Sequence, residues 1–170
     1  MSQVNPAASR LPDRPDHSDH PDHPDLPYKP PFAYLGAIAV GVGVHHWWPM
    51  QARPGGWMLL GVALVVLGVS LLVWAKVVFR AKRTPLEPWK ATKAIVSEGP
   101  FAWSRNPVYI GFAIIQVGIG VWSDELAVVA LVIVPVVMTA LLIVPREEAY
   151  LRRKFGAEYE GYCARVRRWL

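Results

Sequence analysis

The chain has 170 residues, of which 53% are hydrophobic, and its formal net charge is +5 at pH 7. The length suits one domain, and the apolar content is above the average for soluble proteins. These values favour an integral-membrane protein. Basic residues beside anionic lipid account for the charge, so it does not indicate a nucleic-acid partner.

The first 27 residues form a low-complexity arm rich in Pro, Asp and His. Its centre places His17, His20 and His23 three residues apart. Because three residues make one turn of a polyproline helix, these imidazoles could share an edge and bind a transition metal weakly. A disordered polar arm is the simpler interpretation. We therefore predict a disordered arm at 1–27, a membrane domain at 28–170 and no metal site.

Four apolar runs follow, and none of them contains Asp, Glu, Lys or Arg: Phe32–Trp48, Trp57–Ala75, Val108–Trp122 and Leu126–Pro145. A membrane-crossing helix needs roughly 20 apolar residues, and buried helices of a soluble protein would carry polar faces. No such faces occur, and glycines within the runs permit close helix packing. The sequence predicts an all-α bundle of four transmembrane helices at about 32–48, 57–79, 107–122 and 125–145.

Lys and Arg are concentrated in two of the segments outside these runs. Residues 80–105 and the C-terminal tail are rich in both, whereas 49–56 holds only Arg53 and 123–125 holds none. The positive-inside rule then places both termini in the cytoplasm. We expect an integral protein of the inner or plasma membrane if the chain is bacterial. The single Cys163 cannot form an internal disulfide.

Two cytoplasmic segments accompany the predicted spans. Residues 80–104 contain several prolines and apolar residues, which predicts a structured loop folded back on the bundle. In residues 146–168, apolar residues recur at helical spacing, with charges on the other side. This pattern predicts amphipathic C-terminal helices at the membrane surface, divided at Gly156.

A polar stretch, EGPFAWSRNPVYIG, begins at Glu98 and leads into the third apolar run. Asn106 and Pro107 are suited to cap and start a helix, so we expect the Asn106 side chain to cap free N–H groups. Arg105 beside that helix start would form an anion site, with Tyr109 on the same face. An ordinary helix start with an arginine reaching the lipid surface explains the same residues without a ligand.

A second polar cluster, Glu147 and Glu148, follows the fourth apolar run directly. Membrane topology does not require acidic residues there. Adjacent helical positions point about 100° apart, so one carboxylate can face the bundle and the other a basic partner or solvent.

Together, these two stretches resemble the isoprenylcysteine carboxyl methyltransferase family and its phospholipid-methyltransferase relatives. The family pattern is Arg-His-Pro-x-Tyr, an apolar stretch, and a Glu-Glu pair followed by an aromatic tail. The matching positions here are Arg105, Pro107, Tyr109, Glu147, Glu148, Phe155, Gly156, Tyr159 and Tyr162. The match covers about the last 75 residues, and Asn106 stands where the family has histidine.

The resemblance implies a membrane methyltransferase that uses S-adenosyl-L-methionine, releases S-adenosyl-L-homocysteine and acts on a lipophilic or small-molecule acceptor. It implies catalytic roles for Arg105, Tyr109 and Glu148. The cofactor-binding positions that it implies are Gly99, Arg105, Asn106, Pro107, Tyr109, Glu147, Glu148 and Tyr159. Arg105 suits the cofactor's carboxylate, and the Glu-Glu pair suits its ammonium or ribose hydroxyls.

The acceptor stays open at this stage. Isoprenylcysteine carboxyl O-methylation is the first interpretation, with phospholipid or small-amine N-methylation as the alternative. A non-catalytic membrane scaffold that recruits partners through its basic tail is a different class of function. A transporter is the least consistent, because no Asp, Glu, Lys or Arg lies inside the apolar runs.

Overall fold

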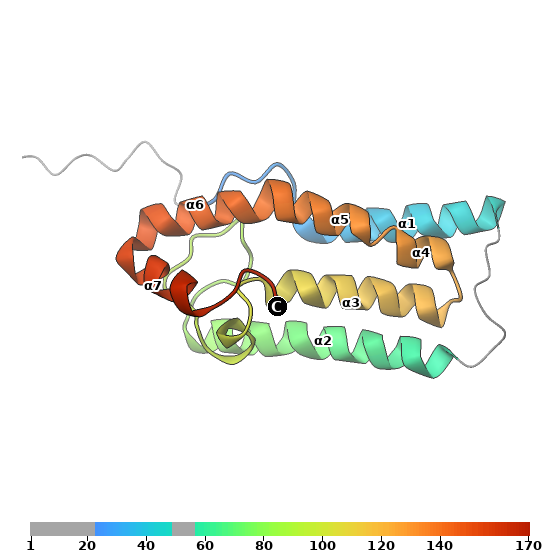
Figure 1. Cartoon of the computed structure of the whole chain (residues 1–170), viewed down its shortest axis with the longest axis horizontal. Coiled ribbons are helices and arrows are strands. Elements are labelled where there is room, and N and C mark those ends of the chain that lie inside the picture. The colour runs from blue at the N-terminus through green and yellow to red at the C-terminus, as the bar shows by residue number, and fades with distance from the viewer. Residues whose placement is uncertain (1–22, 49–56) are drawn as a thin grey trace, which may run out of the picture.

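The structure is a computed structural model of the chain that describes residues 23–48 and 57–170. Within these ranges every regular element is a helix, and the one β-bridge joins Ser104 to Arg167. Most of the helices run side by side as long rods (Figure 1). His17, His20 and Arg53 lie outside the described residues.

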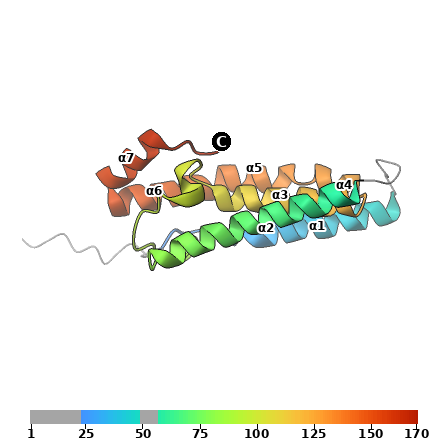
Figure 2. The ribbon, with the colours of Figure 1, turned by 90° about the horizontal axis from the view of Figure 1, so that it is seen from below.

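The first two helices cross the bundle in opposite directions. Helix α1 (Pro30–Trp47) begins with prolines, which fit the first turn because their missing N–H groups are not needed there. Helix α2 (Met58–Ala81) is continuous and carries most of the second apolar run. The start of α1 and the end of α2 therefore lie at the same end of the molecule (Figures 1 and 2).

The loop after α2 packs back onto the helices instead of extending into solvent. It includes the short 3-10 helix η2 (Gly99–Ala102). Val96 and Phe101 are buried against Ala75 of α2. Helix α3 (Pro107–Trp122) then returns along α2.

The last apolar run forms an interrupted helical rod: α4 (Leu126–Ala130), α5 (Ile133–Met138), the π-helical turn η3 (Thr139–Ile143) and α6 (Val144–Phe155). The break at 131–132 precedes Pro135 by one turn, and η3 ends two residues before Pro145. Because proline removes a helical hydrogen bond and crowds the preceding turn, both irregularities have a local cause. The helical segment predicted at about 125–145 lies within Leu126–Phe155, with these two irregularities.

The chain reverses after α6 and returns toward the start of α3. Gly156 has a φ of +50° and separates α6 from α7 (Ala157–Arg165), as predicted. The last residues run beside the loop that precedes α3, and α7 projects from that end of the bundle (Figure 2).

Glycines set the close contact between α2 and α3. A Cβ at Gly61 would lie 2.3 Å from the backbone nitrogen of Trp122, and one at Gly118 would lie 2.9 Å from the carbonyl oxygen of Gly61. No side chain fits at such distances. The two helices therefore pack with backbone against backbone, as small residues allow in membrane bundles.

By length and composition, two helical segments of the described chain can cross a membrane: Met58–Ala81 and Leu126–Phe155. Helix α3 is also apolar but has only 16 residues. The exposed faces of α1 and α2 carry large apolar residues such as Phe32, Leu35, Leu59 and Leu67. Such surfaces suit a lipid environment.

We predict that Gly61→Ala lowers the free energy of unfolding by about 1 to 3 kcal/mol, because the added methyl group overpacks against backbone. Gly36→Ala is the matched control, since a Cβ there meets nothing within 4 Å. Denaturant unfolding in mixed micelles measures both. Equal stability of the two variants would contradict the close packing of α2 and α3.

Candidate functional site

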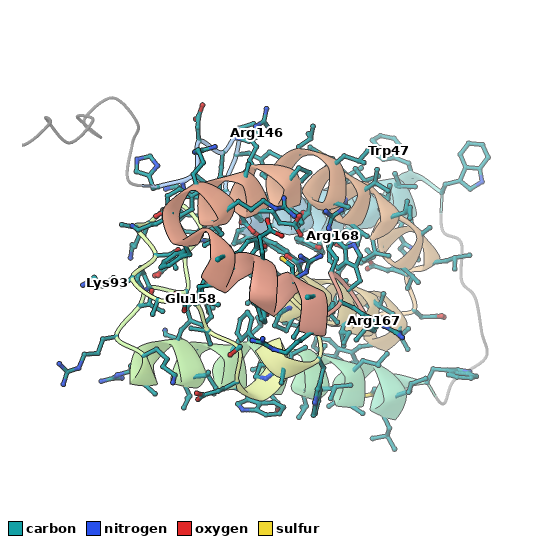
Figure 3. The ribbon with its side chains drawn as sticks, turned by 60° about the vertical axis from the view of Figure 1, so that its left-hand side comes forward. Trp47, Lys93, Arg146, Glu158, Arg167 and Arg168 are labelled. Carbon is teal, nitrogen blue, oxygen red and sulfur yellow. The ribbon has the colours of Figure 1, made fainter. Side chains whose placement is uncertain are left out.

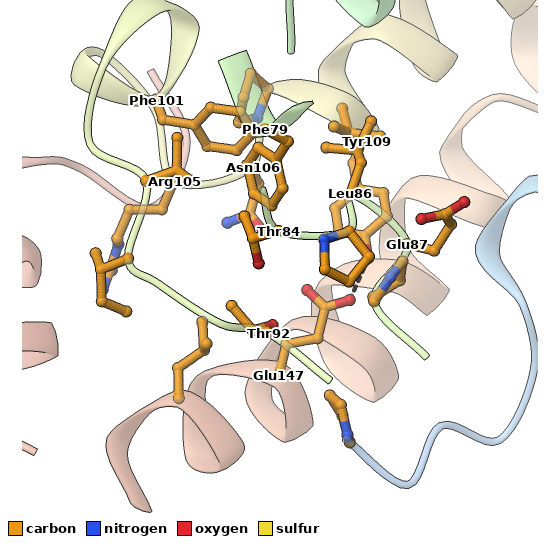
Figure 4. Close-up of a pocket in the computed structure, with 18 of the residues that line it drawn as sticks. Phe79, Thr84, Leu86, Glu87, Thr92, Phe101, Arg105, Asn106, Tyr109 and Glu147 are labelled. Atoms are coloured by element: carbon orange, nitrogen blue, oxygen red, sulfur yellow. Dashed lines mark hydrogen bonds between the residues drawn. The ribbon is translucent and has the colours of Figure 1, made fainter. Parts of the chain in front are cut away.

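A cavity of about 550 Å³ lies at the end of the bundle where the loop, α3, α6 and α7 meet. Apolar residues of α2, α3 and the loop form much of its wall, including Phe79, Leu86 and Val108. Polar side chains from several segments also reach it: Lys76, Arg80, Arg83, Thr84, Glu87, Thr92, Arg105, Asn106, Tyr109, Glu147, Tyr150, Tyr159 and Tyr162. Figure 4 shows Glu147 entering from α6, opposite Arg105 and Asn106.

The start of α3 brings the first polar cluster to this cavity. Pro107 occupies the first helical turn, as predicted. Asn106 precedes the helix, but its side chain makes no capping hydrogen bond, so that prediction is wrong. Instead its Nδ2 donates to the carbonyl oxygen of Arg168 at 2.8 Å. The Asn106 side chain is thus bound to the C-terminal tail and does not cap the helix.

Tyr109 links the first cluster to the second. Its phenol donates a hydrogen bond to Oε1 of Glu147. Both side chains line the cavity. Tyr109 also packs with Ile143 and Val144 at the end of the π-turn, which fixes the ring. A carboxylate of α6 is therefore held at the cavity wall by a residue of α3.

Glu148 faces a different set of partners, as the 100° offset predicts. Its side chain is only 4% exposed and lies among three guanidinium groups. Arg168 binds both carboxylate oxygens, at 3.0 and 2.7 Å. Arg105 lies 3.4 Å away, and Arg152, one turn along α6, lies 3.7 Å away. Such a buried carboxylate is stable only with this compensation.

The backbone of the C-terminal tail holds the loop in place. The N–H of Arg105 donates to the carbonyl oxygen of Arg167 at 2.9 Å. The hydroxyl of Ser104 donates to the carbonyl of Arg168 at 3.4 Å. The same hydroxyl accepts from the N–H of Asn106 at 3.1 Å. These bonds fix the approach of the chain into α3.

The aromatic residues of α7 close the site from the other side. Tyr162 donates to the carbonyl oxygen of Phe101 at 2.9 Å. Burial raises the pKa of Tyr162, an effect that the Arg105 charge partly offsets. Burial, and then the charge of Glu148, raise the pKa of Tyr159. Both phenols therefore stay protonated near neutral pH. Cys163 accepts a hydrogen bond from Nη1 of Arg105.

Most of the residues implied by the resemblance meet at this cavity. Those that line it are Arg105, Asn106, Pro107, Tyr109, Glu147 and Tyr159. Glu148 lies behind the cavity in its arginine cluster, and Gly99 does not line the cavity. A Cβ at Gly99 would instead meet Val78 and Trp74 of α2, so its lack of a side chain serves packing.

Sequence reasoning missed several residues of the site. In the sequence, Arg168 is one of several basic residues that indicate the cytoplasmic side of the membrane. In the structure it is the main partner of Glu148. The loop residues Thr84, Leu86 and Thr92 line the cavity and carry no motif that would identify them. The segment before α1 also reaches it through Pro24. Pairing between sequence-distant segments gives no signal in a single sequence.

Comparison with known proteins assigns the class. The model of the phospholipid methyltransferase family matches residues 57–158, which is more than half of the chain. The chain therefore belongs to the phospholipid methyltransferase family, a family of membrane methyltransferases. No curated protein and no solved structure matches it.

We predict that Glu148→Ala destabilises the protein by about 3 kcal/mol, because it leaves buried positive charge without its partner. The value is at the lower end for buried pairs, since the Arg168 side chain is 45% exposed. Glu160→Ala is the control. Glu160 also pairs with Arg152, but its side chain is 59% exposed, so the loss should stay below about 1 kcal/mol. Similar losses in the two variants would contradict the role given to Glu148.

Proposed function

We propose that this chain is an integral-membrane methyltransferase that binds S-adenosyl-L-methionine in the cavity and methylates a lipophilic acceptor. The observation that carries the proposal is the meeting of two polar clusters at one cavity. Tyr109 is bonded to Glu147, and Arg105 is paired with Glu148. Membership of a methyltransferase family supports the same reaction class.

The proposed topology has four membrane spans and both termini in the cytoplasm. It assigns α1, α2, α3 and the rod from Leu126 to the spans, and places α7 and the loop at the inner surface. The concentration of Lys and Arg in residues 80–105 and in the tail supports this orientation. The cavity would then lie at the inner surface, where both a soluble cofactor and a lipid can reach it.

The residues present fit the methyl donor. The cavity volume lies within the range of about 300–1,000 Å³ that is usual for small-molecule sites. Nε of Arg105 is buried without a hydrogen-bond acceptor, so the guanidinium retains capacity for an anion such as the donor's carboxylate. Glu147 offers a carboxylate for the ammonium or the ribose hydroxyls. The phenol of Tyr109 presents a ring face that attracts a sulfonium cation.

The bound donor supplies an electrophilic methyl group, and the protein has to orient the reactants. The acceptor atom has to be held about 3 to 3.5 Å from the methyl carbon, in line with the bond between that carbon and sulfur. Two bound reactants in this geometry react as in an intramolecular step, without the entropy cost of meeting in solution. The apolar wall formed by Phe79, Leu86 and Val108 excludes water from that contact. Asn106 stands where the family has histidine, and its amide binds the tail instead of exchanging a proton. Replacement of that histidine therefore removes no catalytic base from this site.

We propose a lipid amine as the acceptor. Glu87 lines the cavity, and its carboxylate can attract an ammonium group and accept the proton that an amine must lose. Lys76, Arg80 and Arg83 line it as well and suit the phosphate of a headgroup. The second candidate is an isoprenylcysteine carboxylate, which the resemblance of the motifs to that family favours.

Binding of S-adenosylhomocysteine tests the proposed site. We predict that Arg105→Ala weakens binding about tenfold or more, the effect of losing a charge-assisted hydrogen bond. Arg153→Ala, an exposed change on α6, should bind as the wild type does. Isothermal titration in detergent measures the affinities, with the unfolding midpoint as a check on folding. Failure of the folded wild-type protein to bind would reject the proposal.

The chemistry of the product tests the acceptor. We predict that radiolabelled methyl groups transferred to a membrane extract stay attached after mild base, because an N-methyl amine resists hydrolysis. A carboxyl methyl ester would release the label as methanol. Release by base would support the isoprenylcysteine-like alternative, and no transfer to any membrane component would favour the scaffold class.

A further inference from the structure

The C-terminal tail carries an arginine that neither the motifs nor the family match assigns. Arg168 lies ten residues beyond the matched range of 57–158. Its guanidinium binds both oxygens of Glu148, and this contact raises the pKa of Arg168. Figure 3 shows Arg168 close to α6, with Arg167 farther away.

Arg168 competes with Arg105 for the same carboxylate. Arg168 makes two hydrogen bonds of ordinary length, at 3.0 and 2.7 Å. The closest approach of Arg105 to Glu148 is 3.4 Å. Arg105 is thus a loose partner of Glu148, and its Nε has no acceptor. Of these two arginines, only Arg105 lines the cavity.

We propose that Arg168 is a positioning residue for the methyl-donor site. It occupies both oxygens of Glu148, so that the Arg105 guanidinium remains turned toward the cavity and available to the donor's carboxylate. This inference rests on the proposed function. It adds to that function a residue that is not part of the family motifs and that sets the affinity for the cofactor.

Loss of the Arg168 side chain has a defined consequence. Glu148 is almost completely buried and needs a close cationic partner. With Arg168 removed, the nearest guanidinium in the cluster is that of Arg105. Arg105 would close the 3.4 Å gap and form the two hydrogen bonds that Arg168 now makes. Apart from Nη1, which donates to Cys163, its donors would then be used inside the cluster instead of in the cavity.

The tail itself does not depend on that side chain. The bonds that hold it come from the carbonyl groups of Arg167 and Arg168, which accept from Arg105, Asn106 and Ser104. Trp169 packs beside the cluster of Tyr109, Ile143 and Val144. Substitution of Arg168 should therefore leave the C-terminal tail in place and change only the charge balance at Glu148.

The test compares two ligands that differ in the group Arg105 would bind. S-adenosylhomocysteine carries the amino-acid carboxylate, and 5′-methylthioadenosine is a related nucleoside thioether that lacks it. We predict that Arg168→Gln weakens binding of the first about tenfold and leaves binding of the second unchanged, both measured by isothermal titration. Arg168→Lys keeps the charge without the two-pronged geometry and should fall between. Arg165→Gln, an exposed change of equal charge on α7, should bind both ligands as the wild type does.

Double substitution separates positioning from structural damage. In an Arg105→Ala background, Arg168→Gln should cause no further loss of S-adenosylhomocysteine affinity, because its effect acts through Arg105. Equal weakening for both ligands would overturn the inference in favour of a structural role. Unchanged affinity for both would overturn it while leaving the proposed function intact. Absence of S-adenosylhomocysteine binding in the wild-type protein would instead reject the proposed function.

Discussion

The buried carboxylate of Glu148 is the interaction on which the organisation of the site depends. It draws together arginines from the loop before α3, from α6 and from the C-terminal tail. In the sequence, α3, α4, α5 and η3 separate the loop from α6, and α7 separates α6 from the tail, so no motif alone would bring the three segments together. Because an uncompensated carboxylate is costly in a buried position, Glu148 needs these cationic partners, one of which, Arg168, comes from the C-terminal tail. The tail in turn fixes the approach into α3 through backbone hydrogen bonds.

The bundle makes this arrangement possible because the end of α2, the start of α3 and the start of α6 all lie beside the cavity. Backbone packing of α2 on α3 leaves little freedom for either helix to slide, since glycines at the contact admit no side chain. The π-turn before α6 shifts the register of the rod near Pro145. Glu147 then meets Tyr109, while Glu148 meets the arginines. Two adjacent carboxylates thus receive different partners and different roles.

The sequence alone predicts the helical class and the approximate position of each apolar run, because continuous apolar composition is a strong signal. The start of α3 at Pro107 and the division at Gly156 also follow from local chemistry. The capping role predicted for Asn106 is wrong because its amide donates to a carbonyl oxygen in the tail. Local sequence preferences cannot predict a contact between residues so far apart in the chain. Arg168 and the loop residues of the cavity wall are missed for the same reason. The irregular rod could have been anticipated from Pro135 and Pro145, whose effect on helices is local.

A structure of the protein in a lipid nanodisc with S-adenosylhomocysteine bound would test the central claim most directly. The account predicts ligand density in the cavity, with the amino-acid carboxylate on Arg105, the nucleoside on the side of Glu147 and Tyr109, and Arg168 still paired with Glu148. Density at another surface, or a cavity filled only by lipid at saturating ligand, would contradict it.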